Sequence, residues 1–203
     1  MIKTIVFDFG NVFLNLDIDG AVNYALDLFK LQDFPEEMMA VNSLYEQGLL
    51  TSSEFIEFYS ENFPEIDDDK IIHTWNFMLK DFPKYRLEFL QNLKETKEHK
   101  LILLSNTNEI HIDWVKKHVP FYEDFKKCFD EFYLSHEIKL RKPTTEIFDF
   151  VLSDNNLNAK ETLFIDDNQD NITAAKQLGY KIWHINPKTE DVINLFKIKK
   201  DLF

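Results

Sequence analysis

The chain has 203 residues, of which 44% are hydrophobic and 29% charged, so it is not disordered and has room for one domain or a core with a smaller insertion. A formal net charge of −13 argues against nucleic acid and anionic membranes as partners, and any phosphate ligand would need local positive charge. The single cysteine, Cys128, excludes an internal disulfide and is typical of a small packed side chain in a reducing cytoplasm.

A short apolar run, Thr4–Phe9, predicts the first strand, and the region after it contains no convincing strand. The spacing of apolar residues there predicts four amphipathic helices: Ile18–Leu31, Pro35–Gln47, Ser52–Asn62 and Asp67–Leu79. Thr51 followed by Glu54 is typical of a helix start. The three aspartates at 67–69 indicate another helix start, because the later ligands of a calcium loop are missing. We therefore predict a small helical domain at residues 17–82, inserted after the first strand.

The rest of the chain alternates short apolar runs with helical segments. Four runs resemble the first strand: Lys100–Leu104, Glu131–Leu134, Thr162–Ile165 and Lys181–Ile185. Helical spacing is found in Tyr85–Thr96, Thr144–Leu152 and Asn171–Leu178, the last closed by Gly179. The apolar runs are continuous rather than alternating, as expected of parallel strands covered on both faces. This order predicts an α/β fold, a Rossmann-like doubly wound parallel sheet of five or more strands, formed by residues 1–16 and 83–203.

No part of the sequence predicts export or membrane insertion. The apolar stretch after Lys3 ends at Asp8, which is shorter than the core of a secretory signal. No apolar run reaches the ~18 residues of a membrane span. We therefore expect a cytoplasmic protein that has no membrane partner.

Four polar clusters follow predicted strands, and ligands of open α/β sheets bind at the carboxyl ends of strands. The clusters are Asp8–Val12, Ser105–Asn108, Lys139–Pro143, and Asp166–Asn168 with Asn171. Each alone is an ordinary turn or helix start, but together they supply a nucleophile, groups for phosphoryl oxygens, a cation and acids for a metal. Acids at the tips of buried strands, here Asp8, Asp166 and Asp167, are costly unless a cation lies between them. This indicates a hard divalent ion, Mg²⁺.

In these four motifs the chain resembles the haloacid dehalogenase superfamily with an inserted helical cap of the first type, and the resemblance spans nearly the whole chain. The first motif, Asp-x-Gly-Asn-Val, is most similar to that of the sugar-phosphate phosphatases related to bacterial α-glucose-1-phosphate phosphatase. The resemblance implies a Mg²⁺-dependent phosphatase that hydrolyses a small phosphate monoester through an aspartyl-phosphate intermediate. It also implies a small phosphorylated metabolite as partner, with a sugar 1-phosphate as the first candidate, and a monomer or homodimer.

The same resemblance assigns a nucleophile and a metal site. Asp8 would be the nucleophile and a ligand of Mg²⁺, together with the backbone oxygen of Gly10 and the carboxylate of Asp167. Asp166 would bind the metal through water or hold the surrounding shell, and Asn171 would support that shell.

The phosphoryl group, by the same resemblance, is held by the second and third motifs. Ser105 and Asn106 would donate hydrogen bonds to it. Lys142 would neutralise the phosphoryl charge and position Asp8, so that Asp8 and Lys142 are the catalytic residues.

The first motif departs from most phosphatases of this superfamily at Gly10, where they carry a second aspartate that acts as general acid and base. Such help is typically worth ~10²–10⁴ in rate. Three explanations stay open at this point. Another residue of the inserted region substitutes, with Asp17 and Asp19 the nearest candidates, although both are expected to be exposed. Otherwise the substrate has a good leaving group, or the chain is a slow or inactive relative.

Two other functions are weighed against the phosphatase. A catalytically weak or inactive relative would bind phosphate or protein without turnover, and Gly10 favours it. A metal-independent 2-haloacid dehalogenase also lacks the second aspartate. The acidic pair Asp166–Asp167 argues against the dehalogenase, because it would gather negative charge beside Asp8 without a bound cation.

Overall fold

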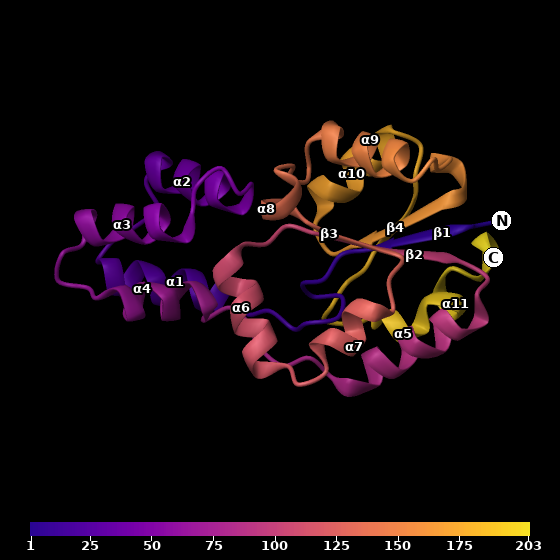
Figure 1. Ribbon diagram of the computed structural model, residues 1–203, viewed down its shortest axis with the longest axis horizontal. Helices are drawn as coiled ribbons and strands as arrows, with labels where there is room; N and C mark the ends of the chain where they lie inside the picture. The colour runs from indigo at the N-terminus through magenta and orange to yellow at the C-terminus, as the bar shows by residue number, and fades with distance from the viewer.

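One parallel sheet organises the computed structural model, which describes residues 1–203 (Figure 1). Its five strands are β1 (Thr4–Phe7), β2 (Lys100–Ser105), β3 (Glu131–Leu134), β4 (Thr162–Asp166) and β5 (Lys181–His184). They lie in the order β3-β2-β1-β4-β5, and each neighbouring pair is parallel. The predicted doubly wound α/β fold is confirmed, and each predicted strand ends within two residues of the observed one.

The central strand β1 brings distant parts of the chain to one edge of the sheet. Its Phe7 is in register with Leu103 of β2 and Ile165 of β4. The backbone N–H of Asp8 then donates to the carbonyl oxygen of Ile165 at 2.9 Å. The residues that follow these partners, Asp8 and Asp166, are therefore neighbours at the carboxyl edge of the sheet.

Helices cover both faces of the sheet (Figure 1). Successive side chains of β1 point to opposite faces, so Ile5 and Phe7 join the larger core cluster and Val6 joins the smaller one. The larger cluster is covered by α5 (Lys84–Thr96), α7 (Tyr122–Lys127) and α11 (Leu195–Ile198). The smaller cluster is covered by α9 (Thr145–Asp154) and α10 (Gln169–Gln177).

Four further helices lie beyond the carboxyl ends of the strands, at the left of Figure 1. They are α1 (Ile18–Phe29), α2 (Glu36–Glu46), α3 (Ser52–Asn62) and α4 (Asp68–Asn76), called the helical insert below. Phe55, Tyr59 and Ile71 are fully buried in its own core. The insert contains no strand, as predicted, while the domain limits 17–82 stay a prediction.

The helix starts in the insert follow the predicted capping chemistry. The Thr51 hydroxyl oxygen accepts a hydrogen bond from the N–H of Glu54, and the Glu54 carboxylate accepts one from the N–H of Thr51. Asp67 caps α4 by accepting from the N–H of Lys70, which agrees with a helix start and not with a calcium loop. The predicted helix Asp67–Leu79 is three residues too long at its end, because α4 stops at Asn76.

Several elements were not among those predicted from the sequence. Between the strands these are α6 (Glu109–His118), α7, α8 (Ser135–Ile138) and the 3₁₀ turn Ala159–Glu161, and after β5 they are α11 and the 3₁₀ turns Val192–Asn194 and Lys200–Leu202. Helix α6 matters for the site, because it starts just after the second polar cluster and its Ile110 belongs to the core of the insert. No helix of the chain combines the length and the apolar character that crossing a membrane requires.

Candidate active site

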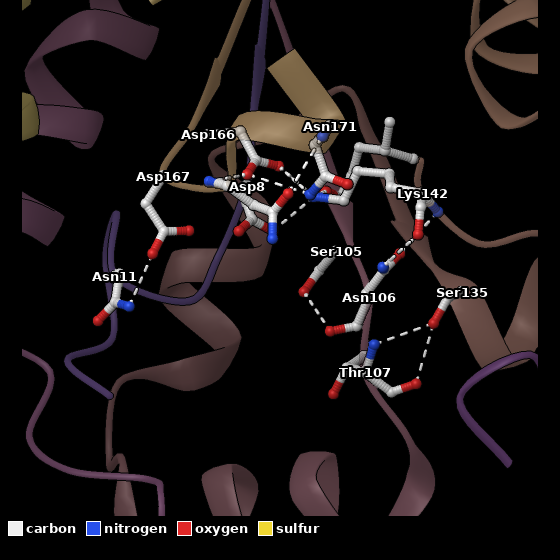
Figure 2. A network of polar contacts seen from close by, with 12 residues as sticks. Asp8, Asn11, Ser105, Asn106, Thr107, Ser135, Lys142, Asp166, Asp167 and Asn171 are labelled. Carbon is white, nitrogen blue, oxygen red and sulfur yellow. Dashed lines mark hydrogen bonds and ion pairs between the residues drawn. The ribbon is translucent and has the colours of Figure 1, made fainter. Parts of the chain in front are cut away.

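Lys142 is the centre of a buried polar network at the carboxyl edge of the sheet (Figure 2). Its side chain is fully buried, and Nζ donates to Asp8 Oδ1 at 2.8 Å, to Asp166 Oδ2 at 2.7 Å and to the Leu104 carbonyl oxygen at 2.7 Å. An ammonium group has three protons, so all of them have a partner here. The lysine is therefore held in one position against the Asp8 carboxylate.

Asp166 is the most completely hydrogen-bonded acid of the network. It is fully buried, and besides Lys142 it accepts from the backbone N–H of Asn168 at 2.8 Å. The Asn171 amide lies 3.1 and 3.0 Å from its two oxygens. Asn168 also caps α10, which fixes Asn171 in the first turn of that helix. This arrangement is compatible with the supporting roles that the sequence predicts for Asp166 and Asn171.

Asp167 has a partner that the sequence reasoning missed. Its Oδ2 accepts a hydrogen bond from the side-chain amide of Asn11 at 2.8 Å, and its other carboxylate oxygen has no protein partner. Asn11 has φ 55°, in the left-handed region that asparagine tolerates better than most residues, and its own oxygen accepts from the N–H of Leu16. The Asp-x-Gly-Asn-Val motif contained this asparagine, but spacing alone gave it no task.

Three carboxylates meet in this network. Ligand oxygens of Asp8, Asp166 and Asp167 all lie within 4.8 Å of one another. The backbone oxygen of Gly10, the other predicted metal ligand, accepts no hydrogen bond from the protein. Asp8 Oδ2 and one oxygen of Asp167 likewise accept no hydrogen bond from the protein. Free carboxylate and carbonyl oxygens of this kind are the hard donors that suit Mg²⁺. The residues present therefore fit the predicted metal.

The charges of the network also favour a bound cation. Burial raises the pKa of the Asp8 carboxyl to about 7, against the opposing effect of Lys142. Burial also raises the pKa of Asp167 above its usual value. Burial disfavours the charged form of Lys142, yet Asp166 and Asp8 outweigh this and raise its pKa. One lysine thus does not offset three acids, and a second cation would favour their ionised forms.

The two predicted phosphate-binding residues of the second motif, Ser105 and Asn106, differ in their hydrogen bonds. The Ser105 hydroxyl, at the end of β2, is buried, and its one contact is a long 3.4 Å hydrogen bond to the carbonyl oxygen of Asn106. The Asn106 side chain is occupied, because its amide donates to the Lys142 carbonyl oxygen at 2.8 Å and its oxygen accepts from the Lys142 N–H at 2.9 Å. The Asn106 side chain therefore holds the backbone of Lys142 in place. Its predicted contact with a phosphoryl group stays a prediction.

Position 10 packs closely against Leu16. A Cβ atom added at Gly10 would lie 2.6 Å from Cδ1 of Leu16, the end of a flexible side chain that would have to turn aside for a second aspartate. The two acids considered as substitutes are elsewhere. Asp17 caps α1 and pairs with Lys80 at 3.5 Å, and Asp19 is exposed. Neither lines the cavity beside Gly10, which agrees with the expected exposure of both.

Two adjoining cavities lie between the sheet edge and the insert. The smaller, of about 80 Å³, is lined by Gly10 and Ser105, and the larger, of about 260 Å³, lies among helices of the insert. Both are lined by Glu46, Met78 and His111. Sequence spacing gave no signal for Glu46 or His111, since neither belongs to a motif and the six histidines show no metal-ligand spacing.

The comparison with protein families agrees with this geometry. A family model described as a haloacid dehalogenase-like hydrolase matches residues 2–179. The chain belongs to this family. The predicted superfamily is thereby confirmed, and the family agrees with the predicted enzyme, a phosphatase, in being a hydrolase.

Several relatives of this haloacid dehalogenase-like hydrolase match along almost their whole length. It is 31% identical to D-ribitol-5-phosphate phosphatase from Bacteroides thetaiotaomicron over 191 residues, which cover 89% of this chain and 90% of the relative. A haloacid dehalogenase family enzyme from the same organism, crystallised with magnesium, matches with a TM-score of 0.84 and 35% identity over 97% of this chain and 98% of that one. The same enzyme in complex with magnesium and inorganic phosphate matches with a TM-score of 0.80 and 33% identity, over 97% of this chain and 100% of that one.

Proposed function

We propose that the protein is a Mg²⁺-dependent phosphatase that hydrolyses a small phosphate monoester through an aspartyl phosphate on Asp8. The observation that carries the proposal is the network around Lys142, in which one ammonium group holds Asp8 Oδ1 at 2.8 Å beside two further acids. A phosphoryl group adds more negative charge at this place, so a nucleophilic carboxylate works there only if cations offset the repulsion.

Asp8, Asp167 and the carbonyl oxygen of Gly10 would hold Mg²⁺, with Asp166 and Asn171 supporting them. When bound, the ion supplies positive charge for the phosphoryl oxygens. The Mg²⁺ complexes of the structural neighbours support this assignment.

The chain's own residues account for the phosphoryl transfer. Asp8 attacks phosphorus in line, the bond between phosphorus and the ester oxygen breaks, and the leaving oxygen takes a proton from water. Lys142 keeps the carboxylate in place and offsets charge on the phosphoryl oxygens. The Ser105 hydroxyl, which has only a long hydrogen bond, donates to one of these oxygens. Water then cleaves the aspartyl phosphate and regenerates Asp8. The helical insert, with proposed limits 17–82, acts as the cap that excludes bulk water.

A phosphorylated polyol or sugar is the substrate class that we propose. The similarity to a D-ribitol-5-phosphate phosphatase supports it, and so does the volume of the larger cavity, about 260 Å³, which suits a small leaving group. Because no aspartate stands at position 10, we expect turnover to be fastest for esters with a good leaving group.

The proposed function is tested by hydrolysis of p-nitrophenyl phosphate with Mg²⁺ and after chelation of the metal. Wild-type protein should turn over only with Mg²⁺, and Asp8→Asn should abolish turnover because an amide does not form the acyl phosphate. Asp33→Asn, a change of the same kind at an exposed residue, is the matched control and should keep full activity. Turnover that survives in Asp8→Asn would remove Asp8 from the nucleophile's role.

One observation favours a second candidate, a relative that binds phosphate without turnover. Position 10 is a glycine packed against Leu16, so no general acid–base group stands there. This candidate predicts that inorganic phosphate binds in the presence of Mg²⁺ while a panel of phosphate esters stays intact. The dehalogenase alternative predicts chloride release from 2-chloro acids without Mg²⁺, and the cluster of three acids argues against it.

A further inference from the structure

The boundary between the two cavities is made by three side chains. Glu46, Met78 and His111 line both the cavity beside Ser105 and the larger cavity of the insert. A phosphate ester with its phosphoryl group at the sheet edge would therefore place the first atoms of its leaving group beside these residues.

His111 is fixed in its neutral form at this boundary. Its Nε2 lies 3.0 Å from the carbonyl oxygen of Trp75, which only accepts, and its Nδ1 lies 3.3 Å from the side-chain amide nitrogen of Asn108, which only donates. The tautomer with the proton on Nε2 satisfies both contacts. Burial lowers the pKa of His111, which also favours the uncharged ring.

Glu46 is consequently the charged group at the boundary. Its Oε2 accepts from Arg141 Nε at 2.5 Å, while Oε1 accepts no hydrogen bond from the protein. Arg141 itself lines neither cavity, so the carboxylate is the nearer charge for a bound leaving group.

The remaining walls of the two cavities offer no cation to a second anionic group. No lysine or arginine lines either cavity. Of the polar side chains in the larger one, Thr74 donates its hydroxyl hydrogen to the backbone of Lys70, and Asn42 accepts from the Tyr59 hydroxyl and keeps its amide hydrogens free. A free carboxylate oxygen and a free amide suit hydroxyl groups, while a second anionic group on the ligand would face Glu46 and find no cation of its own in the cavity walls.

We propose that Glu46 determines substrate specificity by selecting a neutral, hydroxylated leaving group and rejecting one that carries a second anionic group. This inference rests on the proposed phosphatase function. A hydroxyl near the ester donates to the free oxygen of Glu46, whereas a carboxylate or second phosphate in the same place is repelled.

The test uses two substrates that differ in one group, glycerol 3-phosphate with a terminal hydroxymethyl and 3-phosphoglycerate with a carboxylate. Wild type should prefer glycerol 3-phosphate in kcat/KM by about tenfold or more. Glu46→Gln should remove most of this preference by raising kcat/KM for 3-phosphoglycerate. Arg141→Gln should increase the preference, because it leaves the carboxylate of Glu46 without its cation.

Both variants break the same ion pair, but the preference for glycerol 3-phosphate should fall in Glu46→Gln and rise in Arg141→Gln. A structural effect of losing the ion pair would change the preference in the same direction in both. A preference that is unchanged in Glu46→Gln, or that moves the same way in both variants, would overturn the proposal. Glu37→Gln, an exposed glutamate on the same helix, is the charge-matched control and should keep the wild-type ratio.

The experiment distinguishes a failure of the proposed function from a failure of this inference. If p-nitrophenyl phosphate is hydrolysed but glycerol 3-phosphate and 3-phosphoglycerate are not, both compounds are tested as inhibitors of that reaction. The ratio of their inhibition constants then measures the preference and decides the role of Glu46. If no ester is hydrolysed, the phosphatase proposal falls, and the ratio of dissociation constants from calorimetry with Mg²⁺ still tests the selection of charge.

Discussion

The two residues that support the acids at the sheet edge and the polar residues that line the cavity of the insert are hydrogen-bonded in opposite ways. On the sheet side, Lys142 uses all three of its protons, and Asp166 accepts hydrogen bonds on both oxygens. On the insert side, Glu46 and Asn42 keep unused hydrogen-bonding capacity. Saturated groups are pre-organised and do not reorganise during a reaction, whereas groups with spare capacity can accommodate a ligand. The sheet edge is thus suited to chemistry and the insert to choosing what enters.

The largest expected effect comes from breaking the saturated side. Lys142→Met leaves the acids of Asp8 and Asp166 buried without their cation, which should lower the free energy of unfolding by about 3–5 kcal/mol and abolish turnover. Arg141→Gln, next to it, breaks an ion pair that is partly exposed on both sides and should cost less than about 1 kcal/mol. Urea denaturation of both variants measures the difference.

Urea denaturation with and without Mg²⁺ tests whether the ion binds beside Lys142. A divalent cation offsets the charge that Lys142→Met leaves behind, so the ion should stabilise this variant against urea more than it stabilises wild type. Equal effects of Mg²⁺ on both proteins would mean that the ion binds away from the Asp8 cluster.

Asn11 connects the metal site to the loop that closes over Gly10, and its loss should be the next largest effect. Replacement of groups that orient metal ligands typically lowers metal affinity by about 10–100-fold. Asn11→Gly removes the amide that holds Asp167 while keeping the φ of 55° accessible, so strain does not confuse the result. Calorimetric titration with Mg²⁺ measures the affinity. Asn11→Asp adds a negative charge beside Asp167, so it should not weaken Mg²⁺ binding in the way that Asn11→Gly does. Comparing the two variants separates the orientation of Asp167 from the charge of the metal site.

The packing of Leu16 over Gly10 should have a modest effect on stability. Gly10→Ala places a Cβ 2.6 Å from Cδ1 of Leu16, and because this end of a flexible side chain can turn aside, the cost should stay at the lower end of overpacking, about 1 kcal/mol. Leu16→Ala in the same chain should relieve most of that cost, so the two changes should be strongly non-additive in thermal unfolding. Additive effects would show that the contact does not restrict position 10.

The different construction of the two sides also explains what the sequence could predict. Continuous apolar runs that end in acids predicted both the sheet and the meeting of Asp8 with Asp166 and Asp167, because the register of parallel strands fixes where those ends lie. Glu46 was not predictable in this way. Its place depends on how the insert packs against the sheet edge, and no spacing along the chain encodes that contact.

The same reasoning explains Asn106. Its position after a strand predicted a residue at the site, but its task depends on the approach of Lys142 from another loop, which takes both polar atoms of the side chain. Short helices such as α7 and α8 were missed because six and four residues are too few to show a helical period.

The smallest expected effect lies within the insert and tests whether the two sides are energetically separate. Thr51→Ala removes the cap of α3 and should cost about 1 kcal/mol of local stability. Hydrogen exchange should speed up in the amides of α3, while the affinity for Mg²⁺ should stay at the wild-type value because Thr51 has no contact with the acidic cluster. Thr51→Ser, which keeps the capping oxygen, should restore slow exchange. A loss of Mg²⁺ affinity in Thr51→Ala would mean that the order of the insert is transmitted to the sheet edge.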